Sequence, residues 1–381
     1  SAVVRRLKPT PATLIGKGQA RGFAEETTAL DVDVVVFDND LTPAQQRNLQ
    51  AIFQCDVVDR VALILDIFAQ HATSKEGMLQ VELALLKYHL PRLRGKGVTL
   101  SRQAGAAGGS IATRGPGETK LETDRRRITS RIAMLERQLR EVRKFRNTQR
   151  KSRRSSALPK VSLVGYTNAG KSTLLNTLTE AGVLTEDRLF STLDSTTRRW
   201  DLAGGQRILV SDTVGFVRSL PHQLVEAFAS TLEEVADADL LLHLVDTSDA
   251  EATNQITAVR EVLETIEAAT VPEIIVLNKA DKADPAALER LKRLYPDAPI
   301  ISALRGTGMD DLHSSIATVL ARGSQDMELL IPFERGEVLA EIYREAEVIA
   351  EAHDETGTVL TARISRSRLA RYEEFATETP S

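Results

Sequence analysis

The chain has 381 residues, of which 42% are hydrophobic, 27% charged and 4% aromatic, so wholesale disorder is excluded. At roughly 100–200 residues per domain, this length predicts two or three domains. The single cysteine, Cys55, excludes an internal disulfide and favours a reducing compartment, so we expect a cytoplasmic protein. No apolar run is long enough for a transmembrane helix, and no signal peptide is recognised. We expect a monomer without an integral membrane segment, with peripheral membrane association left open.

The net charge of −4 hides a strong asymmetry along the chain. Residues 91–157 hold 19 Lys and Arg against 5 Asp and Glu, which gives +14. The remaining residues hold 30 against 48, which gives −18. One basic segment in an acidic protein predicts a polyanionic partner that this segment alone contacts. The low aromatic content argues against the base stacking that RRM domains use.

Residues 1–73 predict an N-terminal α/β subdomain. Asp33–Asp38 (DVVVFD) is typical of a buried strand, and Val57–Asp59 predicts a second short strand. Pro43–Phe53 predicts a helix with Thr42 as its N-cap and proline at its first position. Nothing in these residues points to catalysis.

Residues 74–157 predict a basic helical arm. Ser74–Leu90 forms one helix that Pro91 ends, and Gly95–Gly117 forms a long loop that holds 7 of the 22 glycines. A second helix runs from Leu121 to about Arg150. Its apolar residues recur in steps of 4, 3, 4 and 3, which is a heptad seam: Ile128, Ile132, Leu135, Leu139 and Val142. Facing apolar residues of the first helix (Val81, Leu85 and Leu90) make this an antiparallel hairpin.

Residues 158–324 alternate strand and helix patterns, which predicts a parallel sheet flanked by helices. The expected strands are Val161–Val164, Arg207–Asp212, Leu240–Asp246, Glu273–Asn278 and Pro299–Ser302. Residues 325–381 predict a small C-terminal β-α-β domain, with elements at Met327–Phe333, Gly336–Glu351 and Thr358–Ile364.

The strongest motif lies between the first of these strands and a helix. Gly165–Ser172 reads GYTNAGKS and fits G-x-x-x-x-G-K-[ST], the phosphate-binding loop (P-loop). Its backbone N–H groups and the helix N-terminus bind phosphate oxygens, Lys171 reaches the β- and γ-phosphates, and Ser172 ligates Mg²⁺. The predicted nucleotide contacts here are Gly165, Tyr166, Thr167, Asn168, Ala169, Gly170, Lys171 and Ser172.

Two more motifs follow strand ends in the order that a GTP-binding domain requires. In Asp212-Thr213-Val214-Gly215, the aspartate holds Mg²⁺ through water, and the Gly215 N–H meets the γ-phosphate. In Asn278-Lys279-Ala280-Asp281, the carboxylate accepts hydrogen bonds from guanine N1 and N2, which adenine lacks. After the next strand come Ser302, Ala303 and Leu304, where we expect the Ala303 N–H to meet guanine O6.

A switch segment between Leu184 and Arg199 must supply a threonine to Mg²⁺. Thr192, Thr196 and Thr197 are candidates, and spacing alone does not choose among them.

At this point the sequence resembles the HflX family, bacterial GTPases of the translation-factor class, over essentially its whole length. The residues that carry the resemblance are KYHLPRL (87–93), TRGPGETKLETDRR (113–126), GYTNAGKST (165–173), LFSTLDSTTRR (189–199) and DTVGF (212–216). Lys87 departs from the family pattern, where glutamine is expected, and the loop around residues 104–109 is longer. The resemblance implies Thr192 as the switch threonine for Mg²⁺ and the γ-phosphate. It also implies nucleotide contacts for Phe190, Ser191, Thr192, Leu193 and Asp194. Lys171, Thr192 and Gly215 are then the catalytic candidates.

The resemblance also implies a partner, the 50S ribosomal subunit and its 23S rRNA, contacted through residues 91–157, and no DNA. Its expected activity is GTP-driven splitting or rescue of stalled 70S ribosomes, with the 105–117 loop reaching toward the peptidyl-transferase region. Arg114 and Arg125–Arg127 are plausible RNA contacts. The alternatives are a GTP-switched assembly or regulatory scaffold that does not split ribosomes, and an RNA-remodelling ATPase, which Asp281 disfavours.

Phe216 directly follows the D-x-x-G motif. Many GTPases place there a glutamine that orients the attacking water, whereas a phenyl ring cannot hydrogen-bond water. We therefore expect slow intrinsic hydrolysis that a large partner accelerates.

Together these patterns predict an α/β protein with four parts. They are an N-terminal α/β subdomain (1–73), a basic antiparallel hairpin arm (74–157), a P-loop GTPase domain with a parallel sheet (158–324) and a small C-terminal domain (325–381). The expected cofactors are GTP or GDP and Mg²⁺.

Overall fold

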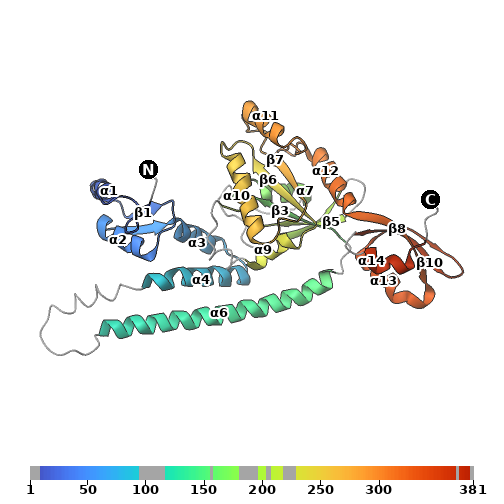
Figure 1. Ribbon diagram of the computed structural model, residues 1–381, viewed down its shortest axis with the longest axis horizontal. Helices are drawn as coiled ribbons and strands as arrows, with labels where there is room; N and C mark the ends of the chain where they lie inside the picture. Colours follow the sequence, from blue (N-terminus) through green and yellow to red (C-terminus); the bar gives the residue numbers. More distant parts are fainter. Residues whose placement is uncertain are drawn as a thin grey trace. The chain divides into compact units, whose positions relative to one another are not determined.

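The computed structural model describes residues 9–93, 116–154, 158–179, 196–202, 207–217, 229–365 and 369–377 (Figure 1). The described residues up to Arg140 form one compact unit and those from Glu141 onward form another. No helix in these ranges is long and apolar enough to span a bilayer.

The N-terminal subdomain is built on a two-stranded parallel sheet. Its elements are α1 (Lys17–Ala29), β1 (Val34–Phe37), α2 (Pro43–Phe53), β2 (Asp56–Asp59) and α3 (Arg60–His71). Helix α2 begins where the sequence predicts, because the Thr42 hydroxyl accepts from the Gln45 N–H (3.2 Å) and the Gln45 side chain accepts from the Thr42 N–H (2.9 Å). The predicted buried strand is wrong in one respect. Val34 and Val36 are 45% and 53% exposed, because the subdomain core lies against only the other face of this small sheet.

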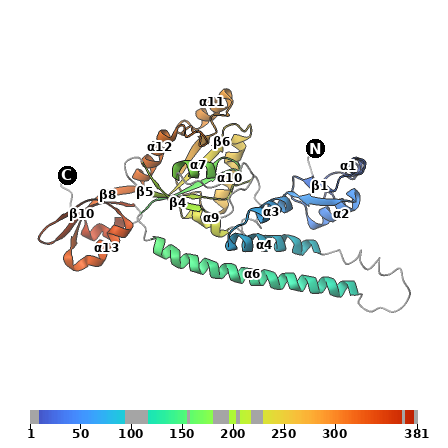
Figure 2. The same ribbon diagram turned by 180° about the vertical axis from the view of Figure 1, so that it is seen from behind.

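The arm consists of α4 (Lys75–His89), the 3₁₀ turn η1 (Leu90–Leu93) and α6 (Pro116–Arg154). Figures 1 and 2 show α4 and α6 side by side and running in opposite directions, as predicted. The heptad seam is confirmed: Leu135 is fully buried, and the other four seam residues are half-buried among exposed neighbours. Helix α6 starts at Pro116 rather than Leu121, because proline suits the first helical turn. The rest of the predicted glycine-rich loop lies outside the described residues.

Two ion pairs join the helices of the arm. Arg131 Nε lies 2.6 Å from Glu82 Oε1, and Lys87 Nζ lies 3.1 Å from Glu136 Oε1. Lys87, which departs from the family pattern, therefore forms an ion pair that links α4 to α6.

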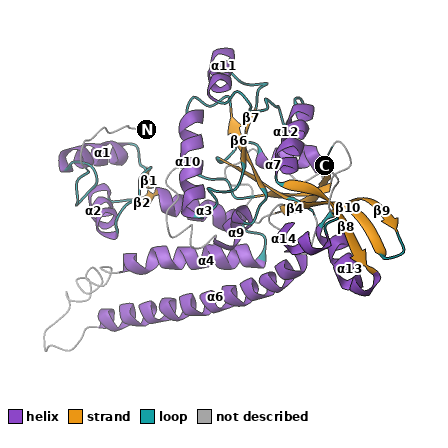
Figure 3. Ribbon diagram, turned by 45° about the vertical axis from the view of Figure 1, so that its right-hand side comes forward, coloured by secondary structure: helices purple, strands orange, loops and turns teal. Residues whose placement is uncertain are grey.

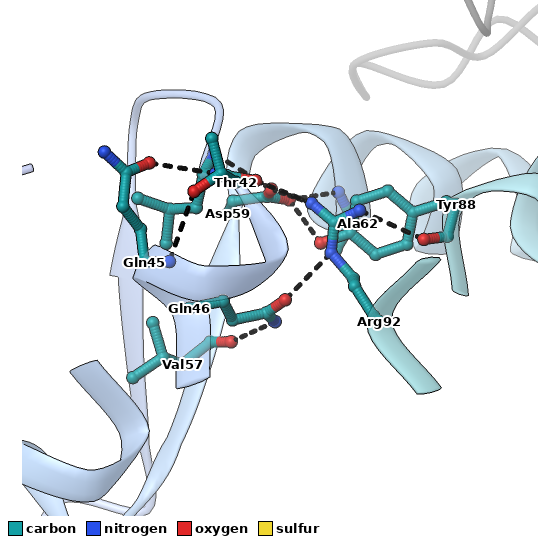
Figure 4. A network of polar contacts seen from close by, with 9 residues as sticks. Thr42, Gln45, Gln46, Val57, Asp59, Ala62, Tyr88 and Arg92 are labelled. Atoms are coloured by element: carbon teal, nitrogen blue, oxygen red, sulfur yellow. Dashed lines mark hydrogen bonds and ion pairs between the residues drawn. The ribbon is translucent and has the colours of Figure 1, made fainter. Parts of the chain in front are cut away.

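A buried carboxylate fastens the arm to the N-terminal subdomain (Figure 4). Asp59 is fully buried and caps α3 by accepting from the Ala62 N–H at 2.9 Å. It also accepts from the Tyr88 hydroxyl at 2.8 Å and from Arg92 Nη2 at 3.0 Å. Burial, with the hydrogen bond to Asp59, raises the pKa of Tyr88 well above its usual range, so the phenol stays a neutral donor.

Arg92 completes this network from the end of η1. Its guanidinium donates to the Leu41 carbonyl (2.7 Å), the Tyr88 carbonyl (3.0 Å) and the Gln46 side chain (2.8 Å), and it lies 3.5 Å from the centre of the Tyr88 ring. The KYHLPRL segment is thus the joint between the subdomain and the arm.

The second unit contains a five-stranded sheet with the order β4-β5-β3-β6-β7. Figure 3 draws its strands in orange among the surrounding helices. Its strands are β3 (Lys160–Gly165), β4 (Thr196–Asp201), β5 (Arg207–Asp212), β6 (Leu240–Asp246) and β7 (Glu273–Asn278). All neighbours are parallel except β4, which runs antiparallel to β5. The remaining predicted strand makes only one parallel bridge, between Ile300 and Leu277.

Helices cover both faces of this sheet. They are α7 (Lys171–Thr179), α9 (Ala229–Ala236), α10 (Ala252–Thr265), α11 (Pro285–Leu294) and α12 (Met309–Arg322). One core packs α7 and α12 on the strands, as with Leu174 and Ile316 against Leu242. The other packs α10 and α11, as with Ile256 and Leu291.

Strand β4 was not predicted, because its sequence TTRRWD falls largely in the expected switch segment and is mostly polar. It forms at the sheet edge, where Arg198 and Arg199 stay exposed and only Trp200 is buried.

The C-terminal domain corrects the predicted β-α-β unit. It contains β8 (Ser324–Pro332), η2 (Phe333–Arg335), α13 (Gly336–Glu345), β9 (Glu347–His353), β10 (Gly357–Ser365), α14 (Leu369–Tyr372) and η4 (Glu373–Phe375). Its sheet is antiparallel with the order β8-β10-β9. The predicted helix to Glu351 is wrong, because Ala346 adopts an extended backbone and the chain then turns back at Asp354, whose carboxylate accepts from the Gly357 N–H at 2.9 Å.

We predict that Asp59→Ala lowers the unfolding free energy of the first unit by about 3 kcal/mol, because it leaves the Arg92 charge and the Tyr88 hydroxyl without their buried acceptor. Native-state hydrogen exchange of the α3 and α4 amides measures this loss. The control is Asp38→Ala, since Asp38 is 90% exposed in its pair with Arg60 and should cost less than about 0.5 kcal/mol. Equal effects of the two substitutions would contradict the structural role of Asp59.

Candidate nucleotide-binding site

The P-loop joins β3 to α7, the context that the motif requires. Gly165 and Gly170 have φ angles of 150° and 95°. A Cβ on Gly165 would lie 2.5 Å from the Leu244 carbonyl oxygen, and one on Gly170 would collide with the Asn278 side chain. Both positions therefore require glycine, and the resulting turn leads directly into the N-terminus of α7.

Lys171 lies buried at the centre of this loop. Its ammonium donates to the carbonyl oxygens of Gly165 (3.2 Å) and Tyr166 (3.1 Å). Burial lowers the pKa of Lys171 to about 8, and the nearby Asp212 carboxylate opposes that shift. Among the described residues, the Lys171 ammonium therefore has only neutral hydrogen-bond acceptors, and phosphate oxygens would be stronger ones.

The Ser172 hydroxyl donates to Asp212 Oδ2 at 2.6 Å, which brings the P-loop and the D-x-x-G motif together. A hydroxyl beside a carboxylate is an oxygen donor set that fits Mg²⁺. Gly215 packs so closely on the P-loop that a Cβ there would lie 2.9 Å from Thr167 Cα and 3.1 Å from Lys171 Nζ. The residues present thus fit a bound magnesium–nucleotide complex.

The middle of the D-x-x-G motif faces the protein interior. The Thr213 hydroxyl donates to the Leu163 carbonyl at 2.7 Å, and Val214 is buried. Any nucleotide contact of these two residues is therefore through their backbone.

The expected switch contacts, residues 190–194 with Thr192, lie outside the described residues, so the choice of Thr192 stays a prediction. The other candidates, Thr196 and Thr197, lie in β4 opposite Asp212 and Ser211.

Asn278 links the P-loop to the loop of residues 302–304, which is the guanine-reading loop expected from the sequence. Its Nδ2 donates to the Ala169 carbonyl in the P-loop at 2.7 Å, and its Oδ1 accepts from the Ala303 N–H at 3.0 Å. In this structure the Ala303 N–H that the sequence assigns to guanine O6 therefore has an internal acceptor. The Ala280 N–H donates to the Ile301 carbonyl at 3.1 Å and supports the same loop.

Asp281, the residue expected to select guanine, is kept ionised. The Ser302 hydroxyl donates to its Oδ1 at 2.7 Å, and Arg305 Nε lies 3.5 Å from its Oδ2. Chiefly through the Ser302 hydrogen bond, the pKa of Asp281 is lowered from its ordinary value. Lys279 adopts φ 61°, and its Nζ lies 2.8 Å from Asp246 Oδ2.

One pocket gathers residues from three of these motifs: Asn168, Gly170, Thr173, Asn278, Lys279, Asp281, Lys282, Ser302, Ala303 and Leu304. The sequence did not predict Thr173 and Lys282 as nucleotide contacts. Each directly follows a motif residue, so sequence adjacency was the available signal.

Phe216 is fully buried and pairs with the P-loop through its backbone. Its N–H donates to the Gly165 carbonyl (3.0 Å), and its carbonyl accepts from the Thr167 N–H (2.9 Å). This side chain has no access to a water molecule at the γ-phosphate position.

Known families and proteins resemble this chain over most of its length. Residues 1–69, 71–153 and 160–279 match the families described as "GTP-binding GTPase N-terminal", "GTP-binding GTPase Middle Region" and "50S ribosome-binding GTPase". "GTPase HflX" of Caldanaerobacter subterraneus subsp. tengcongensis is 44% identical over 364 residues, which cover 96% of this chain and 83% of that protein. "GTPase HflX" of Escherichia coli (strain K12) is 43% identical over 356 residues, covering 93% and 83%. A crystal structure of a GTP-binding protein from Sulfolobus solfataricus in complex with GDP is 26% identical and covers 83% of this chain and 89% of that one, with a TM-score of 0.43.

We predict that GTP binding takes up a proton above pH 8. Without nucleotide, Lys171 has a pKa of about 8 and loses its charge as the pH rises, whereas bound phosphates favour the charged form. Affinity should therefore fall above pH 8, by up to about tenfold per pH unit. Calorimetric titration at pH 9 in two buffers of different ionisation enthalpy measures the uptake, which should vanish at pH 7. The absence of proton uptake at pH 9 would contradict the assignment of Lys171 as a phosphate ligand.

We predict that Asp281→Asn weakens GTP binding by at least about 100-fold and improves xanthosine triphosphate binding, because the amide now donates to the C2 carbonyl of xanthine. Equilibrium binding of labelled nucleotides measures the preference. Asp284→Asn is the matched control, since Asp284 is exposed and caps α11 through the Ala287 N–H. An unchanged preference in Asp281→Asn would remove this residue from the base site.

Proposed function

Because the chain belongs to the HflX family of GTPases, we propose that it docks on the 50S subunit in its GTP state and splits or rescues stalled 70S ribosomes. The chain is a GTP-hydrolysing enzyme. The observation that carries the ribosome proposal is an exposed basic face on α6, on the same chain as the nucleotide site.

This face lies opposite the heptad seam of α6. At 3.6 residues per turn, Arg126, Arg137 and Arg140 lie on the side away from Leu135, and all three are exposed. They span roughly 21 Å along the helix axis. Arg137 and Arg140 have no ion-pair partner among the residues that the structure describes. Arg126 lies 4.0 Å from Glu122, and such an exposed pair is weak. Exposed arginines in a row support binding to RNA phosphates, and we assign 23S rRNA as their partner.

The nucleotide acts as the switch. Lys171 and the N-terminus of α7 bind the β- and γ-phosphates, and the Gly215 N–H senses the γ-phosphate. Mg²⁺, held by Ser172 and through water by Asp212, would neutralise phosphate charge when bound. These contacts order the switch loops in the GTP state, and hydrolysis releases them, so that the protein leaves the subunit. Since Phe216 is buried, the group that positions the attacking water must come from the partner, from a rearranged switch or from another side chain.

We expect that replacing Arg126, Arg137 and Arg140 together by glutamine weakens 50S binding at least about tenfold at physiological salt. Each lost phosphate contact should also reduce the slope of log affinity against log salt by about 1. Co-sedimentation with 50S subunits over a series of salt concentrations measures both quantities.

The matched control replaces Arg290, Lys292 and Arg293, which are exposed on α11, by glutamine. It removes the same charge and should leave binding unchanged. Equal losses in the two triple variants would show that only net charge matters.

We also expect 50S subunits to accelerate single-turnover GTP hydrolysis severalfold or more, because the chain alone lacks a residue that orients water after D-x-x-G. Rapid-quench measurement with excess protein over GTP gives the rate, and 30S subunits serve as the control. Equal rates with and without 50S subunits would refute the partner-stimulated mechanism.

A further inference from the structure

The guanine-reading loop is tied to α7 by a residue that lies outside every nucleotide-binding motif. The Thr177 hydroxyl, in the second turn of α7, lies 2.7 Å from the Ala303 carbonyl oxygen and 3.0 Å from the Thr173 carbonyl oxygen. Ala303 is 2% exposed, so its carbonyl is a buried acceptor, and Thr177 reaches it from the exposed side. This contact links segments that are 126 residues apart.

The Ala303 residue is thereby held on both sides. Its N–H donates to Asn278, and Asn278 in turn donates to the Ala169 carbonyl in the P-loop. Its carbonyl is held by Thr177, which sits on the helix that begins at Lys171. Hydrogen bonds thus run from the P-loop through the end of β7 to the guanine-reading loop, and from there back into the helix that carries the phosphate-binding lysine.

We propose that Thr177 is a positioning residue that holds residues 302–304 over the bound base and so slows nucleotide release. Leu304, next to the held carbonyl, is 72% exposed and lines the pocket, so the loop has little other packing at its tip. Without the hydroxyl, the buried Ala303 carbonyl loses its hydrogen-bond donor, and the loop must turn outward to reach water. The inference rests on the nucleotide site proposed above.

Displacement of fluorescent GDP by excess unlabelled GDP, followed by stopped flow, tests this role. T177V and T177A should both release GDP roughly fivefold faster than the unsubstituted protein, which is the effect of one net hydrogen bond. T177S keeps the hydroxyl and should stay within about twofold. T179V is the matched control, because the Thr179 hydroxyl bonds the Leu175 carbonyl within the same helix at 2.7 Å. Single-turnover hydrolysis of GTP already bound should not change in any of these variants.

Unchanged release in T177V and T177A overturns the proposal. Equally fast release in T177S shows that the hydroxyl does not account for the effect, and equally fast release in T179V assigns the effect to a loosened helix, so either result overturns the proposal too. If the unsubstituted protein does not retain GDP, or if Asp281→Asn retains it equally well, the nucleotide site itself is wrong. These two outcomes would refute the proposed nucleotide site, and the role of Thr177 would be refuted with it.

Discussion

The amide of Asn278 is the interaction on which the nucleotide site depends. It ends a buried parallel strand, and its two polar atoms reach in different directions, to the Ala169 carbonyl of the P-loop and to the Ala303 N–H of the guanine-reading loop. Because one rigid side chain joins both loops, the distance between the phosphate end and the base end of the pocket is fixed before a nucleotide binds. The same requirement explains Gly170, since any side chain there would occupy the position of the Asn278 amide.

A buried carboxylate plays a comparable organising role in the other unit. Asp59 takes hydrogen bonds from the α3 N-terminus, from Tyr88 and from Arg92, and so joins the N-terminal subdomain to the base of the arm. Burying a carboxylate costs folding free energy unless donors satisfy its oxygens. Both oxygens of Asp59 accept hydrogen bonds here. The acidic subdomain therefore fixes where the basic arm begins, and Arg92 lies in η1, which ends the described residues of this part of the chain at Leu93.

Local patterns in the sequence predicted much of this structure. The P-loop, its flanking strand and helix, the Thr42 cap and the Leu135 seam all depend on residues a few positions apart, and all were found. What failed depends on distant partners. Strand β4 is half charged and forms where β5 offers an edge. The helical sequence pattern extends into β9, but the helix ends at Glu345 and Ala346 is extended.

In the nucleotide site too, the features set by neighbouring residues were predicted and those set by distant partners were not. Motif spacing identified Asp281 and Lys171, but it could not show that Asn278 takes the Ala303 N–H, or that Thr177 bonds the Ala303 carbonyl across 126 residues. Those contacts are set by how α7 packs beside the loop that follows Ile301. Sequence spacing therefore identified the chemistry, and the tertiary structure supplied the residues that position it.

The most direct test of the account is sucrose-gradient sedimentation of 70S ribosomes with this protein and a non-hydrolysable GTP analogue at near-physiological salt. The account predicts that 70S particles separate into subunits with the protein on the 50S peak, and that shortening residues 105–117 abolishes separation. Intact 70S ribosomes with the protein at the top of the gradient would contradict it. Intact 70S ribosomes that carry the protein would instead identify a GTP-switched scaffold.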